Sequence, residues 1–381
     1  MQSKDSNMPA SILLEQAKPE DVEALYELET RYFDYDRLSR RSFRWMIQKG
    51  NCDFILAKDE NNIIGYVLVL YHRGTHLARL YSFLVIPKYR GKGIADILLQ
   101  HGEKLAAGRN CIYMRLEVHP KNQTAIRFYE RHAYHPFGLF KDYYEDHADA
   151  LRYQKRILYP DEQMNFFPVP YYQQTTDFTC GPASLIMAMQ ALYKSIKPDR
   201  SMELQLWREA TTIYMTSGHG GCSPTGLALA AWRRNFKVEV WINTQAPPFL
   251  DGVRSEKKKA VMALVHEDFL QQIKETDILI HNEEMELSQL DECLQQGGLS
   301  MVLISSYRFT RNKAPHWVVV SGADETFIYI HDPEEDEDSY RSQTDNLYLP
   351  IAREVFNKAF RFGQSGLRTA VTIYPRKKDK D

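Results

Sequence analysis

The segment Ser82-Phe-Leu-Val-Ile-Pro-Lys-Tyr-Arg-Gly-Lys-Gly-Ile-Ala95 runs from an apolar strand, through a turn with two glycines, into a helix. The first N–H groups of a helix lack partners and carry partial positive charge, so such a turn suits an anion such as a pyrophosphate. Gly91 and Gly93 let the backbone approach phosphates closely, and Arg90 and Lys92 add positive charge. Two spaced glycines also fit an ordinary helix entry, so the surrounding pattern has to decide.

The surrounding chain mixes short β-rich runs with longer helical ones. Strands are expected at residues 12–16, 54–58, 63–72, 78–86, 112–118, 134–140 and 150–157, and helices at 19–30, 93–106 and 123–132. Downstream of the glycine turn lies a second distinctive segment, Leu116-Glu-Val-His-Pro-Lys-Asn-Gln-Thr-Ala-Ile-Arg-Phe-Tyr-Glu-Arg-His132.

The two segments together resemble the GNAT superfamily of acetyl-CoA-dependent N-acetyltransferases, and the second one resembles the RimI-type ribosomal-protein N-alpha-acetyltransferases. The resemblance spans about residues 11–157 and implies a mixed sheet with flanking helices. It implies acetyl-CoA as cofactor, with the pantetheine arm bonded by Phe83, Leu84 and Val85, the pyrophosphate held by Arg90, Gly91, Lys92, Gly93, Ile94 and Ala95, and a further contact from Asn122.

The same resemblance gives Glu117 the position of the general base and Tyr129 that of the general acid toward the leaving thiolate. The chemistry needs such a pair, because an ammonium must lose a proton before it attacks a thioester, and the departing sulfur gains from a nearby O–H. Tyr129 could instead be a packed core aromatic, since it follows Phe128 on a helix.

The second half of the chain reads as helices first, at 180–193, 202–215 and 224–235, and strands later, at 238–242, 300–305, 317–321, 327–331 and 369–374. Cys180 stands directly before the first helix, whose field stabilises a thiolate. His316 opens one expected strand and Asp332 ends the next, so antiparallel pairing would bring their side chains together. The three residues suit the roles of nucleophile, proton carrier and imidazole orienter.

This constellation resembles the papain-like cysteine peptidases that cut bacteriocin leaders after a double glycine, and it spans about residues 165–375. The resemblance implies helices packed on an antiparallel sheet and makes Gln174 the oxyanion-stabilising amide, with Gln173 as the alternative. A glycine-rich insertion holds His219 and Cys222, which could touch substrate but fit a helix-entry loop better. They are too few for a zinc site, and no metal is expected.

These readings divide the chain into a flexible N-terminus at 1–10, an acetyltransferase domain at 11–157, a proline-containing linker at 158–168, a peptidase-like domain at 169–375 and a charged tail at 376–381. The fold class is therefore two-domain α+β. A net charge of -2 gives no reason to expect nucleic acid as a partner, and no apolar run is long enough to cross a membrane. Five widely spread cysteines favour a reducing, cytoplasmic setting. Composition does not indicate the oligomeric state.

Two functions remain open from the sequence alone. The chain could be a bifunctional enzyme that acetylates an amine, such as a peptide N-terminus, and hydrolyses a peptide or related amide bond. Alternatively, its second half could only bind a peptide and present it to the acetyltransferase. The retention of Cys180, His316, Asp332 and Gln174 favours the first hypothesis.

Overall fold

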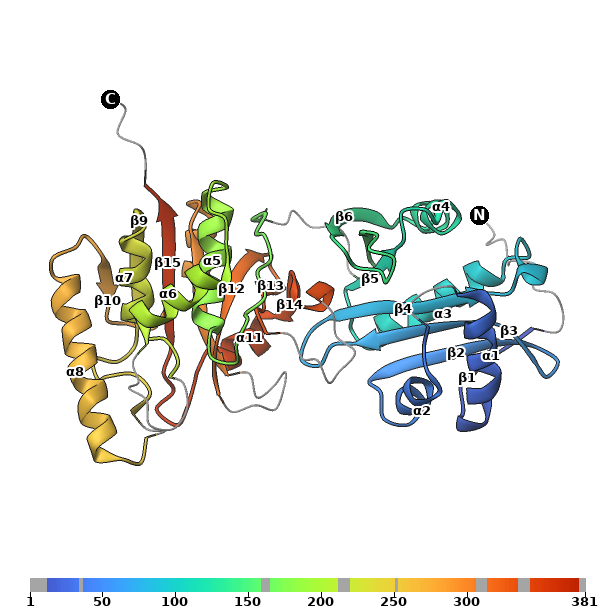
Figure 1. The fold of residues 1–381 in the computed structure, drawn as a ribbon, viewed down its shortest axis with the longest axis horizontal. Coiled ribbons are helices and arrows are strands. Elements are labelled where there is room, and N and C mark those ends of the chain that lie inside the picture. Colours follow the sequence, from blue (N-terminus) through green and yellow to red (C-terminus); the bar gives the residue numbers. More distant parts are fainter. Residues whose placement is uncertain are drawn as a thin grey trace, which may run out of the picture. The chain divides into compact units, whose positions relative to one another are not determined.

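The computed structural model describes residues 12–33, 37–158, 165–211, 220–250, 253–305, 314–334 and 343–376. The chain divides into two compact units, Met1–Asp161 and Glu162–Asp381. Each unit combines helices with one sheet (Figure 1), so both are α+β as the sequence predicts. Within these ranges, no helix has the length and apolar character to cross a bilayer.

The N-terminal unit is built on a seven-stranded sheet of order β1-β2-β3-β4-β5-β7-β6. Its strands are β1 (Ile12–Gln16), β2 (Cys52–Asp59), β3 (Asn62–Tyr71), β4 (Leu77–Val85), β5 (Tyr113–Val118), β6 (His135–Phe140) and β7 (Ala150–Arg156). Its α-helices are α1 (Val22–Tyr32), α2 (Arg40–Gln48), α3 (Ile94–Gly108) and α4 (Gln123–Arg131). Neighbouring strands pair antiparallel except β4 and β5, which run parallel.

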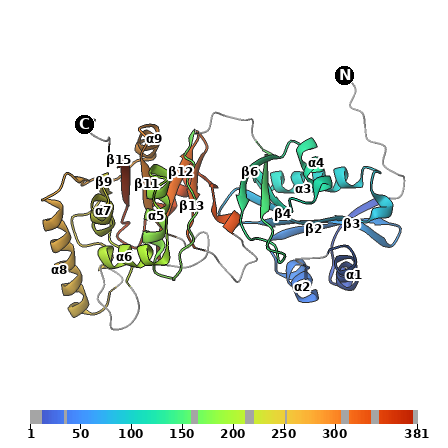
Figure 2. The same ribbon diagram turned by 45° about the horizontal axis from the view of Figure 1, so that its top comes forward.

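Helices cover both faces of this sheet, with α1 and α2 on one face and α3 and α4 on the other (Figure 2). Side chains alternate along each strand to serve both layers. In β2, Ile55 and Ala57 belong to the apolar cluster around α3. Phe54, on the opposite face, stacks against Phe43 of α2, with ring centroids 5.8 Å apart. The two-sided burial explains why the central strands read as continuous apolar runs.

The C-terminal unit is built on an eight-stranded sheet of order β10-β9-β15-β11-β12-β13-β14, with β8 also paired to β12. Its strands are β8 (Asn165–Phe166), β9 (Phe236–Ile242), β10 (Leu279–His281), β11 (Leu299–Ser305), β12 (Pro315–Ala323), β13 (Phe327–His331), β14 (Leu349–Ala352) and β15 (Thr369–Pro375). Its α-helices are α5 (Cys180–Leu192), α6 (Arg200–Ala210), α7 (Pro224–Trp232), α8 (Glu256–Ile273), α9 (Leu287–Gln295) and α11 (Arg353–Ala359). The sheet is mixed rather than wholly antiparallel as expected, because β10 joins β9 in parallel.

Helix α5 lies against the middle of this sheet, packed on β12 and β11. Every residue from Cys180 to Met189 is buried, which leaves the helix no solvent face over that length. The Ser184 hydroxyl donates to the Trp317 carbonyl oxygen at 3.1 Å and ties the first turns of α5 to the start of β12. Residue 180 is thereby held next to the strand that carries His316.

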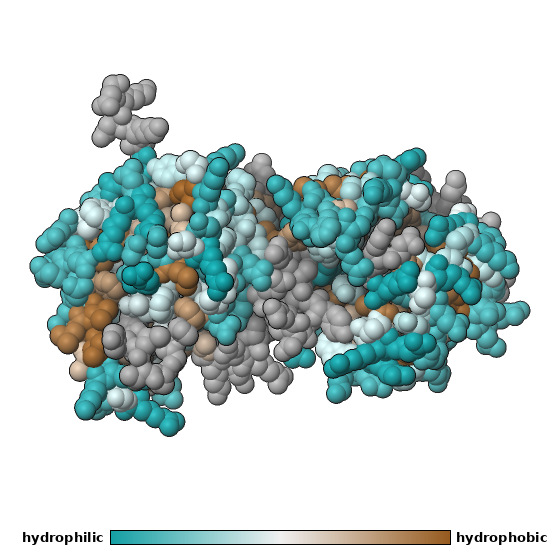
Figure 3. Space-filling model, viewed as in Figure 1, coloured by the Kyte–Doolittle hydropathy of each residue, from teal (hydrophilic) through white to brown (hydrophobic). Residues whose placement is uncertain are grey.

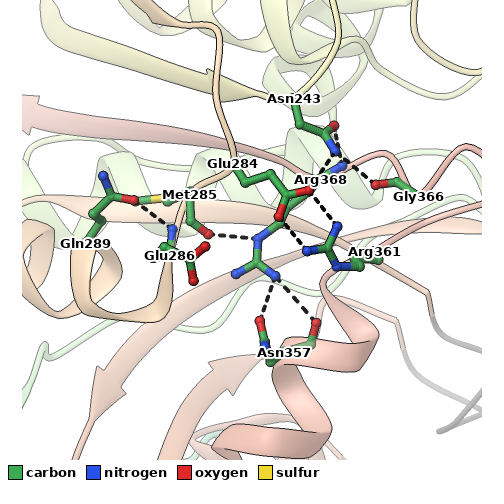
Figure 4. Close-up of polar contacts among 9 residues, drawn as sticks. All are labelled: Asn243, Glu284, Met285, Glu286, Gln289, Asn357, Arg361, Gly366 and Arg368. Atoms are coloured by element: carbon green, nitrogen blue, oxygen red, sulfur yellow. Dashed lines mark hydrogen bonds and ion pairs between the residues drawn. The ribbon is translucent and has the colours of Figure 1, made fainter.

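A polar cluster secures the adjacent end of the same sheet, where β9 ends and β15 begins (Figure 4). Arg368, which is 1% exposed, donates through Nε to the Met285 carbonyl oxygen at 2.7 Å and through Nη1 to Asn357 Oδ1 at 2.6 Å. Glu284 pairs with Arg361. Since β12 and β15 both run antiparallel to β11, the first residues of both strands lie at the same end of the sheet. The cluster therefore stabilises the end of the sheet at which His316 lies.

Candidate active sites

In the N-terminal unit, β4 and β5 separate after a short paired stretch. Their register covers only Leu77–Arg79 against Tyr113–Arg115. The opposite edge of β4 stays paired to β3 as far as Val85, with a register irregularity opposite Leu68 and Val69. On the β5 side, the backbone of Phe83, Leu84 and Val85 therefore has no strand partner among the described residues. An extended group with amides, such as the pantetheine arm of acetyl-CoA, can hydrogen-bond to this backbone as an added strand would.

The glycine turn follows directly and leads into α3. Gly91 and Gly93 have φ of 76° and 80°, a region that residues with a side chain rarely adopt, and a Cβ at either position would meet no atom within 4 Å. Glycine is thus required by the backbone conformation, not by crowding. From Gly91 to Ala95, the backbone N–H groups make no hydrogen bond within the described chain. Five such donors at a helix start form an anion site, and this arrangement fits the pyrophosphate of acetyl-CoA.

Three residues expected to touch the cofactor also have structural contacts. Arg90 uses its backbone N–H in a turn to Pro87 and its Nε to bond the Val85 carbonyl oxygen at 3.0 Å, so it braces the turn. The Lys92 ammonium lies 4.8 Å from the centre of the Tyr89 ring. Asn122 caps α4, with Oδ1 accepting from the Ala125 N–H at 3.1 Å. Among these residues, the anion donors are therefore backbone groups more than side chains.

Glu117 lies near the end of β5 and pairs with a residue that sequence reasoning missed. Arg79 donates to Glu117 Oε2 from Nε at 2.9 Å and from Nη2 at 2.8 Å, and both side chains are about 95% buried, at 4% and 5% exposure. The carboxylate's other oxygen, Oε1, is buried and accepts no hydrogen bond from the described residues. One oxygen is thus fixed in place while the other is open to a donor such as an amine. The sequence feature that could have indicated Arg79 is a single cationic residue within an otherwise apolar strand.

Tyr129 lies on the other face of β5, in the apolar cluster that includes Met114 and Leu116. Since side chains alternate along β5, Glu117 faces away from that cluster. The Tyr129 ring packs edge-on against Phe128 and Tyr134, and burial raises the pKa of its hydroxyl. The hydroxyl has no hydrogen-bond partner in the described parts of the chain. Beyond Arg79 and Arg115, β4 and β5 are no longer paired, so paired strands do not separate the two faces at this point.

In the C-terminal unit, antiparallel pairing of β12 and β13 brings two of the expected residues together. His316 Nε2 lies 2.6 Å from Asp332 Oδ1, and the imidazole is 5% exposed. Asp332 is itself fixed, because its N–H donates to the Asn346 carbonyl oxygen at 2.9 Å and Oδ1 also accepts from the Glu334 N–H. The ring therefore presents its Nδ1 atom away from Asp332.

Cys180 is the first residue of α5 and is 9% exposed. Burial alone would lower the pKa of His316, but the charge and hydrogen bond of Asp332, with a smaller contribution from the neighbouring Cys180 thiol, hold that pKa well above its usual value of 6.5. The imidazole thus lies between the carboxylate and the thiol. Such an arrangement can move the thiol proton to the imidazole and back.

Gln174 is anchored beside the same loop, since its N–H donates to the Pro333 carbonyl oxygen at 3.0 Å. Its Oε1 is buried and makes no hydrogen bond to any residue that the structure describes. The backbone N–H of Cys180, at the open end of α5, likewise has no partner within the described ranges. A side-chain amide and a helix N–H are the donors that an oxyanion needs. The helix N–H is a feature that sequence reasoning did not single out.

Two neighbours of this site were unexpected. Glu334 Oε2 lies 3.8 Å from His316 Nδ1, at the nitrogen that serves Cys180. Cys222 is 2% exposed, and its Cβ lies 3.1 Å from where a Cβ on Gly181 would stand, so it packs under the first turn of α5 instead of facing substrate. His219 lies outside the described residues. Within the described ranges, no three His, Cys, Asp or Glu side chains are grouped as a metal ion requires.

Comparison with known proteins identifies both units. The model of the Acetyltransferase (GNAT) family matches residues 22–134, and the model of the Peptidase_C39 like family matches residues 169–374. The chain belongs to both families. Its GNAT unit is an N-acetyltransferase as the motifs predict, and its C39-like unit has the peptidase-like fold that the second resemblance predicts.

Individual relatives match the GNAT unit. N-alpha-acetyltransferase 30 of Schizosaccharomyces pombe is 33% identical over 126 residues, which is 32% of this chain and 82% of that protein. An uncharacterized N-acetyltransferase of Methanocaldococcus jannaschii is 30% identical over 141 residues, 37% of this chain and 88% of that protein. Among solved structures, the ribosomal-protein-S18-alanine N-acetyltransferase of Escherichia coli has 21% sequence identity and a TM-score of 0.36, covering 40% of this chain and 97% of that one.

Proposed function

We propose that the chain is a bifunctional peptide-modifying enzyme: its GNAT unit acetylates an amine, with a peptide N-terminus as acceptor, and its C39-like unit hydrolyses a peptide or related amide bond. The acceptor class is supported by the name of the Schizosaccharomyces pombe relative, an N-alpha-acetyltransferase. The observation that carries the hydrolytic half is the 2.6 Å hydrogen bond from His316 to Asp332, with the Cys180 thiol at the start of α5 near enough to act on the same imidazole.

For the GNAT unit, acetyl-CoA supplies an activated acetyl group as its thioester. The partnerless N–H groups of Gly91 to Ala95 suit its pyrophosphate, and the open side of β4 suits its pantetheine arm. Glu117 Oε1 accepts a proton from the acceptor ammonium, and the amine then forms a C–N bond as the C–S bond breaks. Tyr129 donates its hydroxyl proton to the departing sulfur. Its isolation from other hydrogen-bond partners keeps that proton available.

For the C39-like unit, His316 Nδ1 takes the thiol proton and Cys180 Sγ attacks the scissile carbonyl carbon. The Gln174 amide and the Cys180 N–H stabilise the oxyanion. The C–N bond breaks as His316 returns the proton to the leaving amine, and water activated by the same imidazole then releases the acyl group from sulfur. Asp332 keeps the ring in the required orientation throughout.

A mass-spectrometric assay tests both halves at once. A mixture of unblocked peptides is incubated with the protein, with and without acetyl-CoA, and products are compared for Glu117→Gln, Cys180→Ala and Cys293→Ala. We expect Glu117→Gln to lose only acetylation and Cys180→Ala to lose only cleavage. Cys293 is a buried thiol on α9, so Cys293→Ala controls for removing a cysteine from the core of the unit.

Two outcomes would refute parts of the proposal. If Cys180→Ala yields the same acetylated and cleaved products as the unaltered protein, the C39-like unit only binds and presents peptide. If no peptide consumes acetyl-CoA, the acceptor is not a peptide amine.

A further inference from the structure

Glu203 is wholly buried on α6, yet the mechanism above does not use it. Its carboxylate accepts hydrogen bonds from the segment that leads into Cys180. Oε1 accepts from the Thr175 N–H at 2.8 Å and from the Thr179 hydroxyl, and Oε2 accepts from the Thr175 hydroxyl at 2.7 Å and the Tyr172 hydroxyl at 3.0 Å. Within the described residues, every hydrogen bond to this carboxylate comes from the chain between residues 172 and 179.

That segment has no helix or strand of its own before α5 begins. It nevertheless has to place two groups, the Gln174 amide and the Cys180 thiol. Its conformation depends on hydrogen bonds from elsewhere in the fold, and the Glu203 side chain of α6 supplies them. The N–H of Gln174 is held separately by the Pro333 carbonyl oxygen. The segment is therefore hydrogen-bonded to two separate elements, α6 and the loop that carries Asp332.

The contact with Thr179 affects the nucleophile most directly. Thr179 is the N-cap residue of α5, a position where a hydroxyl usually accepts from an N–H of the first turn. Here it makes no such cap, and the hydroxyl donates to Glu203. The start of α5 keeps its N–H groups for another acceptor. An oxyanion formed at Cys180 is the acceptor that this arrangement suits.

We propose that Glu203 is a positioning residue for the Cys180 site. It fixes the 172–179 segment so that the Cys180 thiol, the Gln174 amide and the first N–H groups of α5 keep their relative positions. This inference rests on the proposed hydrolytic function. A displacement of about 1 Å at such a site lowers the rate by about 10²-fold. The carboxylate itself does not touch the reacting atoms.

The two oxygens of Glu203 allow a conservative variant. Oε1 must accept, because one of its donors is a backbone N–H, whereas both donors to Oε2 are hydroxyls, which can also accept. Glu203→Gln can therefore keep the arrangement with its amide oxygen toward Thr175 N–H and its NH₂ toward the hydroxyls. Glu203→Ala removes the acceptor of all four hydrogen bonds.

The chain offers a matched control in Asp324, another buried carboxylate of the same unit. It accepts from the N–H groups of Thr326 and Phe327 at 2.9 and 2.7 Å and from the Tyr329 hydroxyl at 2.6 Å, which lie in the β12–β13 turn and on β13. Asp324→Ala thus removes a similar hydrogen-bonded carboxylate without touching the 172–179 segment.

The test follows alkylation of Cys180 by iodoacetamide, read by peptide mapping of the full-length protein, together with kcat and KM for a cleaved peptide. Each variant is measured at a fixed interval below its own unfolding midpoint. For Glu203→Ala we expect alkylation about tenfold slower and kcat about 10²-fold lower with KM little changed, restored largely in Glu203→Gln. Asp324→Ala keeps both rates.

The proposal is overturned if Glu203→Ala alkylates Cys180 at the unaltered rate, or if Asp324→Ala slows it equally. A failure of the proposed function looks different. In that case the unaltered protein cleaves no peptide, while the order of alkylation rates among the variants still holds and supports the positioning role.

Discussion

The two sites of this chain are built in opposite ways. In the GNAT unit, the proposed cofactor site is a row of backbone N–H groups in one continuous segment, shaped by Gly91 and Gly93 and by the separation of β4 from β5. In the C39-like unit, the proposed hydrolytic site is a set of side chains from separate elements, among them His316 and Asp332, which are joined by a hydrogen bond. The first should therefore be sensitive to backbone conformation, and the second to the loss of any one side chain.

The largest effect is expected from His316→Ala, which removes the proposed proton carrier between Cys180 and Asp332. Catalytic groups that act as a unit lose most of their effect together, so peptide cleavage should fall by about 10⁴-fold or more. Acetyl transfer should be unchanged, because His316 belongs to the C39-like unit. Cleavage and acetylation assays on one preparation measure both. A loss of cleavage below about tenfold would contradict the proposed proton-transfer role.

Asp332→Asn should have a smaller effect on cleavage, about 10³-fold, and a distinct effect on stability. Burial opposes the charged imidazole, but Asp332 and Cys180 raise the pKa of His316 well above 6.5. The folded protein thus holds this proton more tightly than the unfolded chain. The resulting stabilisation is complete below pH 6.5 and is lost as the pH rises through the folded value.

Urea unfolding across the interval above pH 6.5 tests this sign. The free energy of unfolding should fall with rising pH in the unaltered protein and fall less in Asp332→Asn, because the pKa of His316 moves back down. Glu334, 3.8 Å from Nδ1, remains as a second carboxylate and should preserve part of the slope. Asp324→Asn serves as control, since that carboxylate bonds the β12–β13 turn. An equal slope in all three proteins would show that Asp332 does not set the charge of the ring.

The contrast between the two sites also explains what could be predicted from the sequence. The glycine turn and the strand before it are local, so their residue types determine the φ values and the free N–H groups directly. His316 and Asp332 could be paired because each stands at an end of a short β-rich run. The Arg79–Glu117 pair and the contacts of Glu203 depend on strand register and helix packing, which residue spacing alone does not fix.

The same reasoning applies to the elements that were missed. Helix α8 leaves Val261 and Leu264 38% and 65% exposed, and apolar side chains gather on the surface in this part of the unit (Figure 3). Met262, Phe269 and Ile273 of α8 are buried along one face, but these further apolar residues outside that face weaken the periodicity that predicts a helix. Helix α2 is short and rich in arginine, and its clearest signal is the N-cap Ser39, which accepts from the Ser42 N–H.

Tyr129→Phe tests a single side chain of the GNAT site. Removing the hydroxyl takes away the proposed proton donor, so kcat for acetyl transfer should fall about 10²-fold with KM for acetyl-CoA little changed. The fold should lose little stability, because the described structure gives that hydroxyl no hydrogen bond to break. Tyr134→Phe is the control, since its hydroxyl bonds Glu103 Oε1 at 3.0 Å within the same aromatic cluster. An unchanged kcat in Tyr129→Phe would assign the ring to packing alone.

The smallest effect is expected from Gly93→Ala, which tests the backbone rather than a catalytic group. An alanine at φ 80° costs about 1–2 kcal/mol, although the structure offers it open space. Relief of that strain would turn N–H groups away from the pyrophosphate, so acetyl-CoA should bind about tenfold more weakly, as measured by calorimetry, while cleavage is untouched. Gly108→Ala at the end of α3 is the matched control, because a Cβ there also meets nothing within 4 Å and its φ is ordinary. Equal affinities in the two variants would mean that the left-handed turn does not hold the cofactor. The GNAT site could then not be described as a site made by backbone conformation, and the proposed contrast between the two sites would be wrong.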